Sequence, residues 1–170
     1  MGGFGSCHTR PFEPPMPDPL AFFLTWTTYG TWLAGDERGW IERGKGDQLP
    51  SAIRKHDAEL RMTEDACVLD EEQREVVEKT IEKHCGIRGW QLHAVNCRTN
   101  HVHVVVSANR APEEVREQFM AWCTRKLKEL QVARRQEPVR ENWWTERGSE
   151  RWIGDEESLE AAIRYVRDGQ

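Results

Sequence analysis

The feature that most constrains the fold of this chain is the stretch TNHVHVVV at positions 99–106. Its alternation of polar and apolar residues, followed by β-branched ones, predicts a strand with one face in a core. Residues two apart in a strand share a face, so His101 and His103 point the same way, with Cα atoms roughly 7 Å apart. Two imidazoles at that spacing can bind one divalent metal ion, although two ordinary core or surface histidines would give the same pattern.

Length, charge and cysteine content limit the class of protein. A chain of 170 residues predicts one domain with a real core. The net charge of −5 argues against a general nucleic-acid binder, yet residues 115–140 carry seven basic and three acidic side chains. Five cysteines without a Cys-x-x-Cys pair favour a reducing compartment over a disulfide framework. With no long apolar run and no signal-peptide pattern, the sequence predicts a soluble, cytoplasmic protein.

The order of predicted elements indicates the fold class. Residues 1–19, rich in glycine and proline, are predicted to be a flexible tail, and residues 20–170 one domain. We expect, in order, a strand at 20–29, a long polar loop at 35–63 with a short helix near 51–60, a helix capped by Asp70, strands at 90–97 and 101–108, a helix opened by Pro112, a short strand or hairpin within 143–153, and a helix capped by Asp155. This order predicts an α+β, ferredoxin-like (RRM-like) antiparallel sheet with helices on one face plus a C-terminal helix.

The last helix carries a tyrosine at the edge of its apolar face. At 100° per residue, Tyr165 stands about 60° from Ala162 and about 100° from Val166. A ring at this position can lie against the sheet with its hydroxyl still accessible. An ordinary tyrosine at the edge of the core would give the same pattern.

Three blocks, in this order and spacing, resemble the HUH endonucleases and, within them, the single-tyrosine transposases. These blocks are TWTTYGTW at 25–32, NHVHVV at 100–105 and AAIRYV at 161–166. The resemblance covers residues 22–170 and includes REP-associated tyrosine transposases and insertion-sequence transposases. No single block is specific, so the order and spacing carry the likeness.

The resemblance implies metal-dependent cleavage and rejoining of single-stranded DNA, in transposition or in a domesticated derivative. Tyr165 would attack the scissile phosphorus and form a 5′-phosphotyrosine. His101 and His103 would hold Mg²⁺ or Mn²⁺. This expectation makes the chain an enzyme with a tyrosine nucleophile.

The third metal ligand stays open. The family commonly has a polar residue, often glutamine, one helical turn after the tyrosine, where this chain has Gly169. Gln170 fits the chemistry of the family, whereas Asp168 fits the geometry of an ideal helix, because it faces the same side as the tyrosine.

The expected partner is single-stranded or hairpin DNA, and a homodimer is compatible with the resemblance. In some dimers of the family the terminal helix serves the partner subunit, and the sequence leaves both arrangements open. The basic side chains expected to contact DNA are Arg125, Lys126, Lys128, Arg134, Arg135, Arg164 and Arg167. Two rival hypotheses are a non-catalytic single-stranded nucleic-acid-binding module with a decayed metal site, and a metal hydrolase that uses water.

Overall fold

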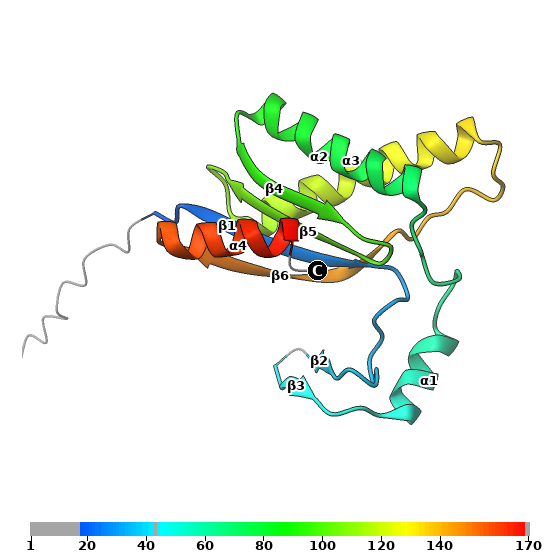
Figure 1. Cartoon of the computed structure of the whole chain (residues 1–170). Helices are drawn as coiled ribbons and strands as arrows, with labels where there is room; N and C mark the ends of the chain where they lie inside the picture. Colours follow the sequence, from blue (N-terminus) through cyan, green and yellow to red (C-terminus); the bar gives the residue numbers. More distant parts are fainter. Residues whose placement is uncertain (1–17, 43, 169–170) are drawn as a thin grey trace, which may run out of the picture.

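The computed structural model describes residues 18–42 and 44–168 (Figure 1). Most of the predicted N-terminal tail therefore lies outside the described residues. The main sheet contains β1 (Ala21–Thr28), β4 (Gln91–Cys97), β5 (His101–Ser107) and β6 (Trp144–Ile153). The other elements are the strands β2 (Trp40–Glu42) and β3 (Gly46–Gln48) and the helices α1 (Ala52–Leu60), α2 (Glu71–Arg88), α3 (Pro112–Ala133) and α4 (Glu156–Asp168).

The four main strands lie in the order β4-β5-β1-β6, and every neighbouring pair is antiparallel. This arrangement confirms the predicted α+β, ferredoxin-like order, with α2 and α3 as the two helices between strands. Those helices cover one face of the sheet, and α4 lies on the other (Figure 1). No helix in the described part of the chain is long and apolar enough to cross a membrane.

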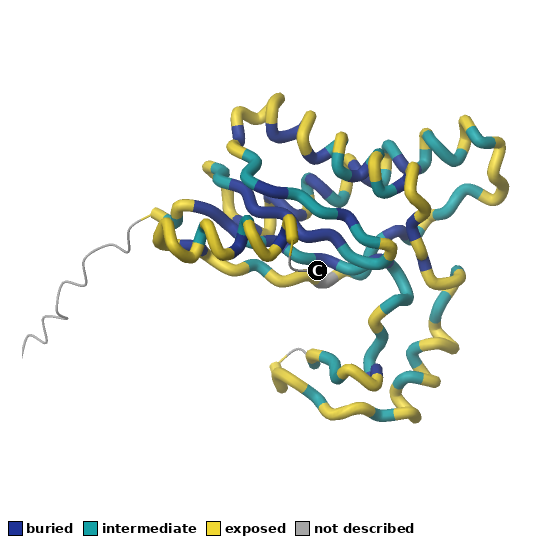
Figure 2. Tube along the Cα trace, viewed as in Figure 1, coloured by how far each residue is buried: buried dark blue, intermediate teal, exposed yellow. Residues whose placement is uncertain are grey.

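The two faces of β1 explain the two cores. Leu24 and Trp26 point toward α2 and α3 and are almost fully buried there, together with Val104 of β5. Phe23 points the other way and packs in the smaller core under α4. Figure 2 shows the buried residues following the central strands and the inner sides of the covering helices.

The start and end of α2 follow from local sequence. The Asp70 side chain accepts a hydrogen bond from the Gln73 backbone N–H, and the Gln73 side chain accepts one from the Asp70 backbone N–H. This reciprocal pair is a capping box, which satisfies two donors at the N-terminus of the helix. Gly89 ends the helix in the left-handed conformation, which glycine adopts without steric cost.

One expectation about irregular segments is corrected, and one of two open alternatives is confirmed. The long loop contains the β2–β3 hairpin in addition to the predicted short helix, which is α1. Hairpin strands of three residues are too short to show an alternating pattern. Residues 144–153 form the single strand β6, with no hairpin at Arg147-Gly148-Ser149.

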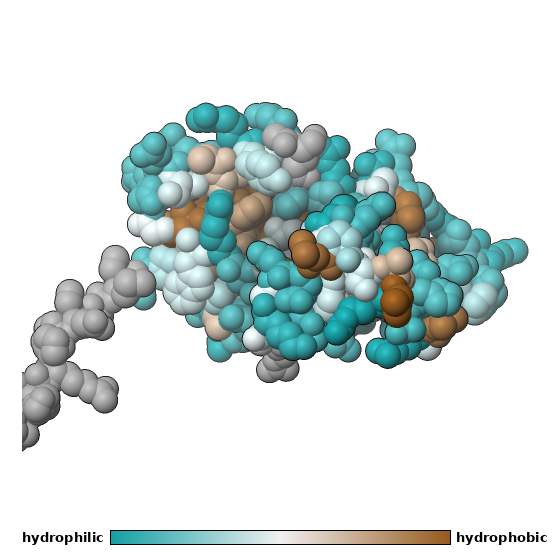
Figure 3. All heavy atoms as spheres, turned by 90° about the horizontal axis from the view of Figure 1, so that it is seen from below, coloured by the Kyte–Doolittle hydropathy of each residue, from teal (hydrophilic) through white to brown (hydrophobic). Residues whose placement is uncertain are grey.

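The β2–β3 hairpin and α1 form an arm that projects from the sheet (Figure 1). Arg38 binds the Asp36 carboxylate and lowers the pKa of Asp36 to about 2. No residue of α1 is buried. In Figure 3, which shows the molecule from below, hydrophobic side chains form separate spots in a hydrophilic surface, as expected for scattered exposed apolar residues.

Gly148 is needed because α3 packs closely on β6. A Cβ atom at Gly148 would overlap the Thr25 carbonyl oxygen and the Arg116 side chain, which is itself buried and paired with Glu150 at 3.0 Å. We expect Gly148→Ala to lower the free energy of unfolding by about 1–3 kcal/mol, because this crowding must displace backbone. Urea denaturation measures the effect. Gly86→Ala is the control: a Cβ atom there meets nothing within 4 Å, so this helical substitution is expected to stabilise the protein.

Candidate active site

The histidine pair lies at the start of β5, on the sheet face that α4 covers. The rings of His101 and His103 are 4.8 Å apart between centroids and nearly perpendicular, at 80°. His103 is buried, at 9 % exposure, whereas His101 is half-buried. The predicted shared orientation of the two imidazoles is therefore present.

Hydrogen bonds hold both rings by their Nδ1 atoms. His103 Nδ1 is 2.9 Å from Thr25 Oγ1, on the residue directly opposite it in β1. His101 Nδ1 donates to Asn100 Oδ1 at 2.7 Å, which fixes the tautomer whose lone pair is on Nε2. Burial, with the nearby His101 and Arg98, lowers the pKa of His103 to about 4. His103 is therefore neutral at physiological pH, which is the state that binds a metal ion.

Tyr165 of α4 lies beside this pair in the same chain. Its ring meets the ring of His103 edge-to-face, with centroids 5.9 Å apart, and meets Phe23 similarly at 6.0 Å. Phe23 in turn stacks on His103 at 5.5 Å. The tyrosine is 48 % exposed, so one side of the ring packs against the sheet and the rest reaches solvent. A helix from one end of the chain and a strand from its middle thus form one cluster of rings.

The position of α4 is fixed by packing and by two hydrogen bonds. Ala162 and Val166 are buried against the sheet. Asn96 of β4, which is paired with His103 in the sheet, donates its side-chain amide to the Val166 carbonyl at 3.0 Å. Arg167 donates to the His93 carbonyl at 3.1 Å. These contacts hold the tyrosine-bearing helix over the histidine strand.

Arg151 of β6 adds a positive charge next to this cluster. Its guanidinium carbon is 5.1 Å from the ring centroid of Phe23, the residue opposite it in β1. No sequence pattern indicated that Arg151, Phe23, Thr25 or Asn96 would lie beside the histidines. Their alternation along the strands is visible in the sequence, but their proximity to the histidines depends on which strands pair and in which register.

The structure does not add a carboxylate or thiolate to the histidine pair. Within residues 18–42 and 44–168, no group of three or more histidine, cysteine, aspartate or glutamate side chains is arranged to hold a metal ion. Asp168 therefore does not complete such a group there. Gln170, the other expected third ligand, lies outside the described residues.

Several basic residues expected to contact DNA are engaged with protein groups. Lys126 and Arg125 share Glu129, and Lys128 pairs with Glu141. These side chains belong to α3, on the other face of the sheet from Tyr165, and so do not join the candidate active site.

Arg134 has a visible structural function, because it pairs with Asp70 and Glu72 and thereby ties the end of α3 to the start of α2. Arg135 is exposed just after α3. Arg164 is exposed on α4, the helix that carries the tyrosine. Of the predicted DNA contacts, Arg164 and Arg167 are therefore the two on the helix that carries Tyr165.

Comparisons with solved structures and with protein families bear on the family of this chain. Two solved structures resemble the chain, each over 93 % of its length with a TM-score of 0.49: a REP-associated tyrosine transposase bound to a REP hairpin, at 11 % identity over 70 % of that chain, and a putative transposase from Deinococcus radiodurans R1, at 13 % identity over 95 % of that chain. No curated protein sequence matches significantly. The sequence model of the IS200-like transposases matches residues 60–169, more than half of the chain, and the protein therefore belongs to the IS200-like transposase family.

Proposed function

We propose that this transposase cleaves and rejoins single-stranded or hairpin DNA at a metal-dependent site, with Tyr165 as the nucleophile. The observation that carries the proposal is the contact between the rings of Tyr165 and His103 within one chain. A phenol beside two imidazoles that share a strand face is the arrangement that attack on a metal-bound phosphate requires. Because α4 packs on its own sheet, the proposal pairs Tyr165 with the histidines of its own chain.

The residues present fit a divalent metal ion. His103 is neutral, and the Nδ1 hydrogen bonds of both histidines orient their rings, as partners of ligating histidines do in metal sites. Nitrogen ligands suit Mn²⁺ better than Mg²⁺. When bound by His101 and His103, the ion would polarise the scissile phosphate and offset its developing charge.

The chain's own residues account for the remaining chemistry. The Tyr165 oxygen loses its proton and bonds to phosphorus, while the bond from phosphorus to the 3′ oxygen breaks. The products are a 5′-phosphotyrosine and a strand that ends in a 3′-hydroxyl after that oxygen takes up a proton. Attack by a 3′-hydroxyl reverses these steps and rejoins the DNA without an external energy source. Arg151 and Arg164 supply positive potential for the phosphate backbone.

The test is to incubate the protein with Mn²⁺ and end-labelled single-stranded DNA that includes hairpins, and to look for an adduct that survives denaturation. We expect an adduct whose DNA-linked peptide contains Tyr165 by mass measurement. The two rivals give other outcomes. A binding module retains DNA without any adduct, and a hydrolase that uses water cleaves DNA without a covalent species.

The Thr25 hydroxyl is expected to tune metal affinity. Thr25→Val removes the oxygen bonded to His103 Nδ1 with little change in shape. Loss of such an orienting partner lowers metal affinity by roughly 10- to 100-fold. Isothermal titration with Mn²⁺ measures the change. Thr80→Val is the control, because the Thr80 hydroxyl bonds to the Val76 carbonyl within α2, on the other face of the sheet from the histidines. Equal affinities for the two variants would show that Thr25 does not orient a metal ligand.

A further inference from the structure

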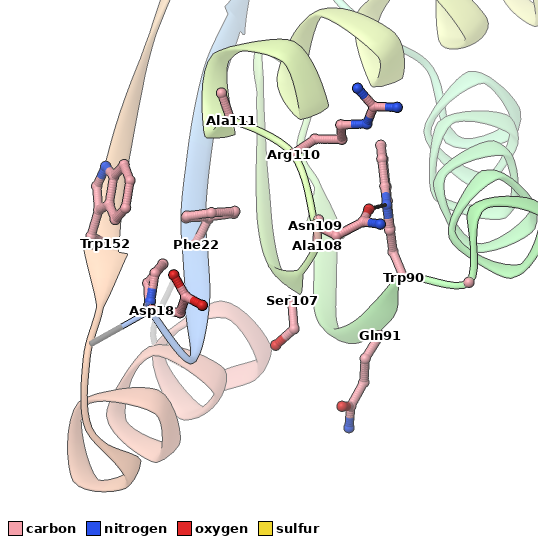
Figure 4. Close-up of a pocket in the computed structure, with 12 residues that line it drawn as sticks. Asp18, Phe22, Trp90, Gln91, Ser107, Ala108, Asn109, Arg110, Ala111 and Trp152 are labelled. Carbon is pink, nitrogen blue, oxygen red and sulfur yellow. Dashed lines mark hydrogen bonds between the residues drawn. The ribbon is translucent and has the colours of Figure 1, made fainter. Parts of the chain in front are cut away.

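A hollow of about 810 Å³ lies at the opposite end of β5 from the histidine pair (Figure 4). It opens on the sheet face that α2 and α3 cover, next to Phe22 of β1 and Trp152 of β6. Trp90 and the loop between β5 and α3 form its other side. Its size is within the range of about 300–1,000 Å³ that is typical of ligand pockets. The rings of Tyr165, His103, His101 and Phe23, here called the Tyr165 cluster, contribute nothing to its lining.

Trp152 gives this hollow an exposed aromatic wall. The residue is 62 % exposed, and its ring meets Phe22 edge-to-face at a centroid distance of 5.4 Å and an interplanar angle of 79°. Figure 4 shows the indole beside Phe22, on the opposite side of the hollow from Trp90. A flat aromatic side chain exposed in this way is a stacking platform for a nucleobase.

Two donors around the hollow match the rest of a nucleotide, and the Asp18 carboxylate lies in the same lining. The Arg110 guanidinium lies 3.8 Å from its nearest carboxylate, on Glu114, beyond hydrogen-bond distance. Asn109 Oδ1 accepts a hydrogen bond from Trp90 Nε1 at 3.0 Å, which orients the Asn109 amide nitrogen as a donor. A phosphate and the edge of a base are the groups that these donors recognise.

The hollow and the Tyr165 cluster meet across the edge of the sheet. β6 is an edge strand, and its neighbouring residues Arg151 and Trp152 point to opposite faces. Arg151 contacts Phe23 beside Tyr165, whereas Trp152 contacts Phe22 in the wall of the hollow. A DNA strand that crosses this edge therefore meets both places within a short length.

We propose that the hollow binds one unpaired nucleobase of the DNA strand, stacked on Trp152, with its flanking phosphate at Arg110. The inference rests on the proposed function, since it requires one DNA strand to reach both the hollow and Tyr165. It gives the transposase a second DNA contact, on the opposite face of the sheet from the chemistry.

The first experiment measures binding alone, without metal. A fluorescently labelled pool of random-sequence single-stranded 20-nucleotide DNA is titrated in EDTA and followed by anisotropy. We expect Trp152→Ala to weaken binding by about 10-fold, the typical loss of one base–aromatic stack. Arg110→Ala is expected to weaken binding and to lower the slope of its salt dependence by about one. Trp122→Ala is the control, because Trp122 is similarly exposed, at 41 %, but lies on α3 outside the hollow.

A second experiment locates the base directly. The same DNA pool with 5-iododeoxyuridine in place of thymidine is irradiated with the protein, and the cross-linked peptide is identified by mass spectrometry. We expect the cross-link at Trp152 or Trp90. Equal affinity of the Trp152→Ala and Trp122→Ala variants, with no cross-link in the hollow, would overturn the inference.

The two proposals fail in different ways. An adduct at Tyr165 combined with full affinity in the Trp152→Ala variant overturns the base site and leaves the nuclease. Binding that depends on Trp152, without any adduct from the wild type, keeps the base site and refutes the nuclease. Absence of any binding of the pool by the wild type overturns the base site.

Discussion

Tyr165→Phe is expected to abolish the covalent protein–DNA adduct and to leave the fold and the DNA affinity unchanged. The substitution removes only the oxygen that would bond to phosphorus, and loss of the nucleophile typically costs more than about 1,000-fold in rate. The ring would keep its contacts with His103 and Phe23. Because the residue is 48 % exposed, we expect a change in stability within about 0.5 kcal/mol. Gel analysis of the adduct under denaturing conditions, beside anisotropy and thermal unfolding, measures all three properties.

The chain offers a matched control for this variant, because it has two tyrosines. Tyr29 lies just after β1, and its hydroxyl accepts a hydrogen bond from the Thr63 backbone N–H at 3.0 Å. Tyr29→Phe is expected to form the adduct at the wild-type level. An adduct that persists in Tyr165→Phe and disappears in Tyr29→Phe would transfer the role of nucleophile to the other tyrosine. An adduct that persists in both would exclude a tyrosine nucleophile.

The sequence predicted the main sheet and its helices because each of these elements carries a strong local signal. Alternation along β5 placed His101 and His103 on one face, and the capping pattern at Asp70 located the start of α2. Helical periodicity placed Tyr165 at the edge of its apolar stripe, and the structure shows it half exposed against the sheet.

The surroundings of the histidines were less predictable because they depend on contacts between distant residues. Thr25 is 78 positions from His103, and only the register between β1 and β5 brings the two side chains together. Arg134 was predicted to contact DNA because it lies in a basic segment, and its ion pairs with carboxylates more than 60 positions away could not be read from the sequence. The need for glycine at position 148 was also not visible in the sequence, because it arises from the Arg116 side chain on α3.

Loss of either histidine is expected to remove most of the metal-dependent activity. His101→Ala and His103→Ala each leave one imidazole to hold the ion. Loss of a residue that only orients a metal ligand already lowers metal affinity or activity by up to about 100-fold. We therefore expect each variant to lose at least about 100-fold in the rate of adduct formation. Mn²⁺ should also raise the melting temperature of the wild type, because an ion that binds only the folded state stabilises it by about 2.7 kcal/mol at a concentration of 100 Kd. This thermal shift should disappear in both variants.

His93→Ala is the control for both variants, because it truncates a histidine on the neighbouring strand β4. His93 Nε2 lies 2.8 Å from Ser107 Oγ, and this pairing gives His93 no part in holding the proposed ion. The control should retain both the adduct and the Mn²⁺-dependent thermal shift. If His101→Ala and His103→Ala retained both as well, two imidazoles could not be the anchor of the metal ion. The phosphate charge would then have to be offset by cationic side chains such as Arg151, and Arg151→Ala would become the variant that loses the adduct.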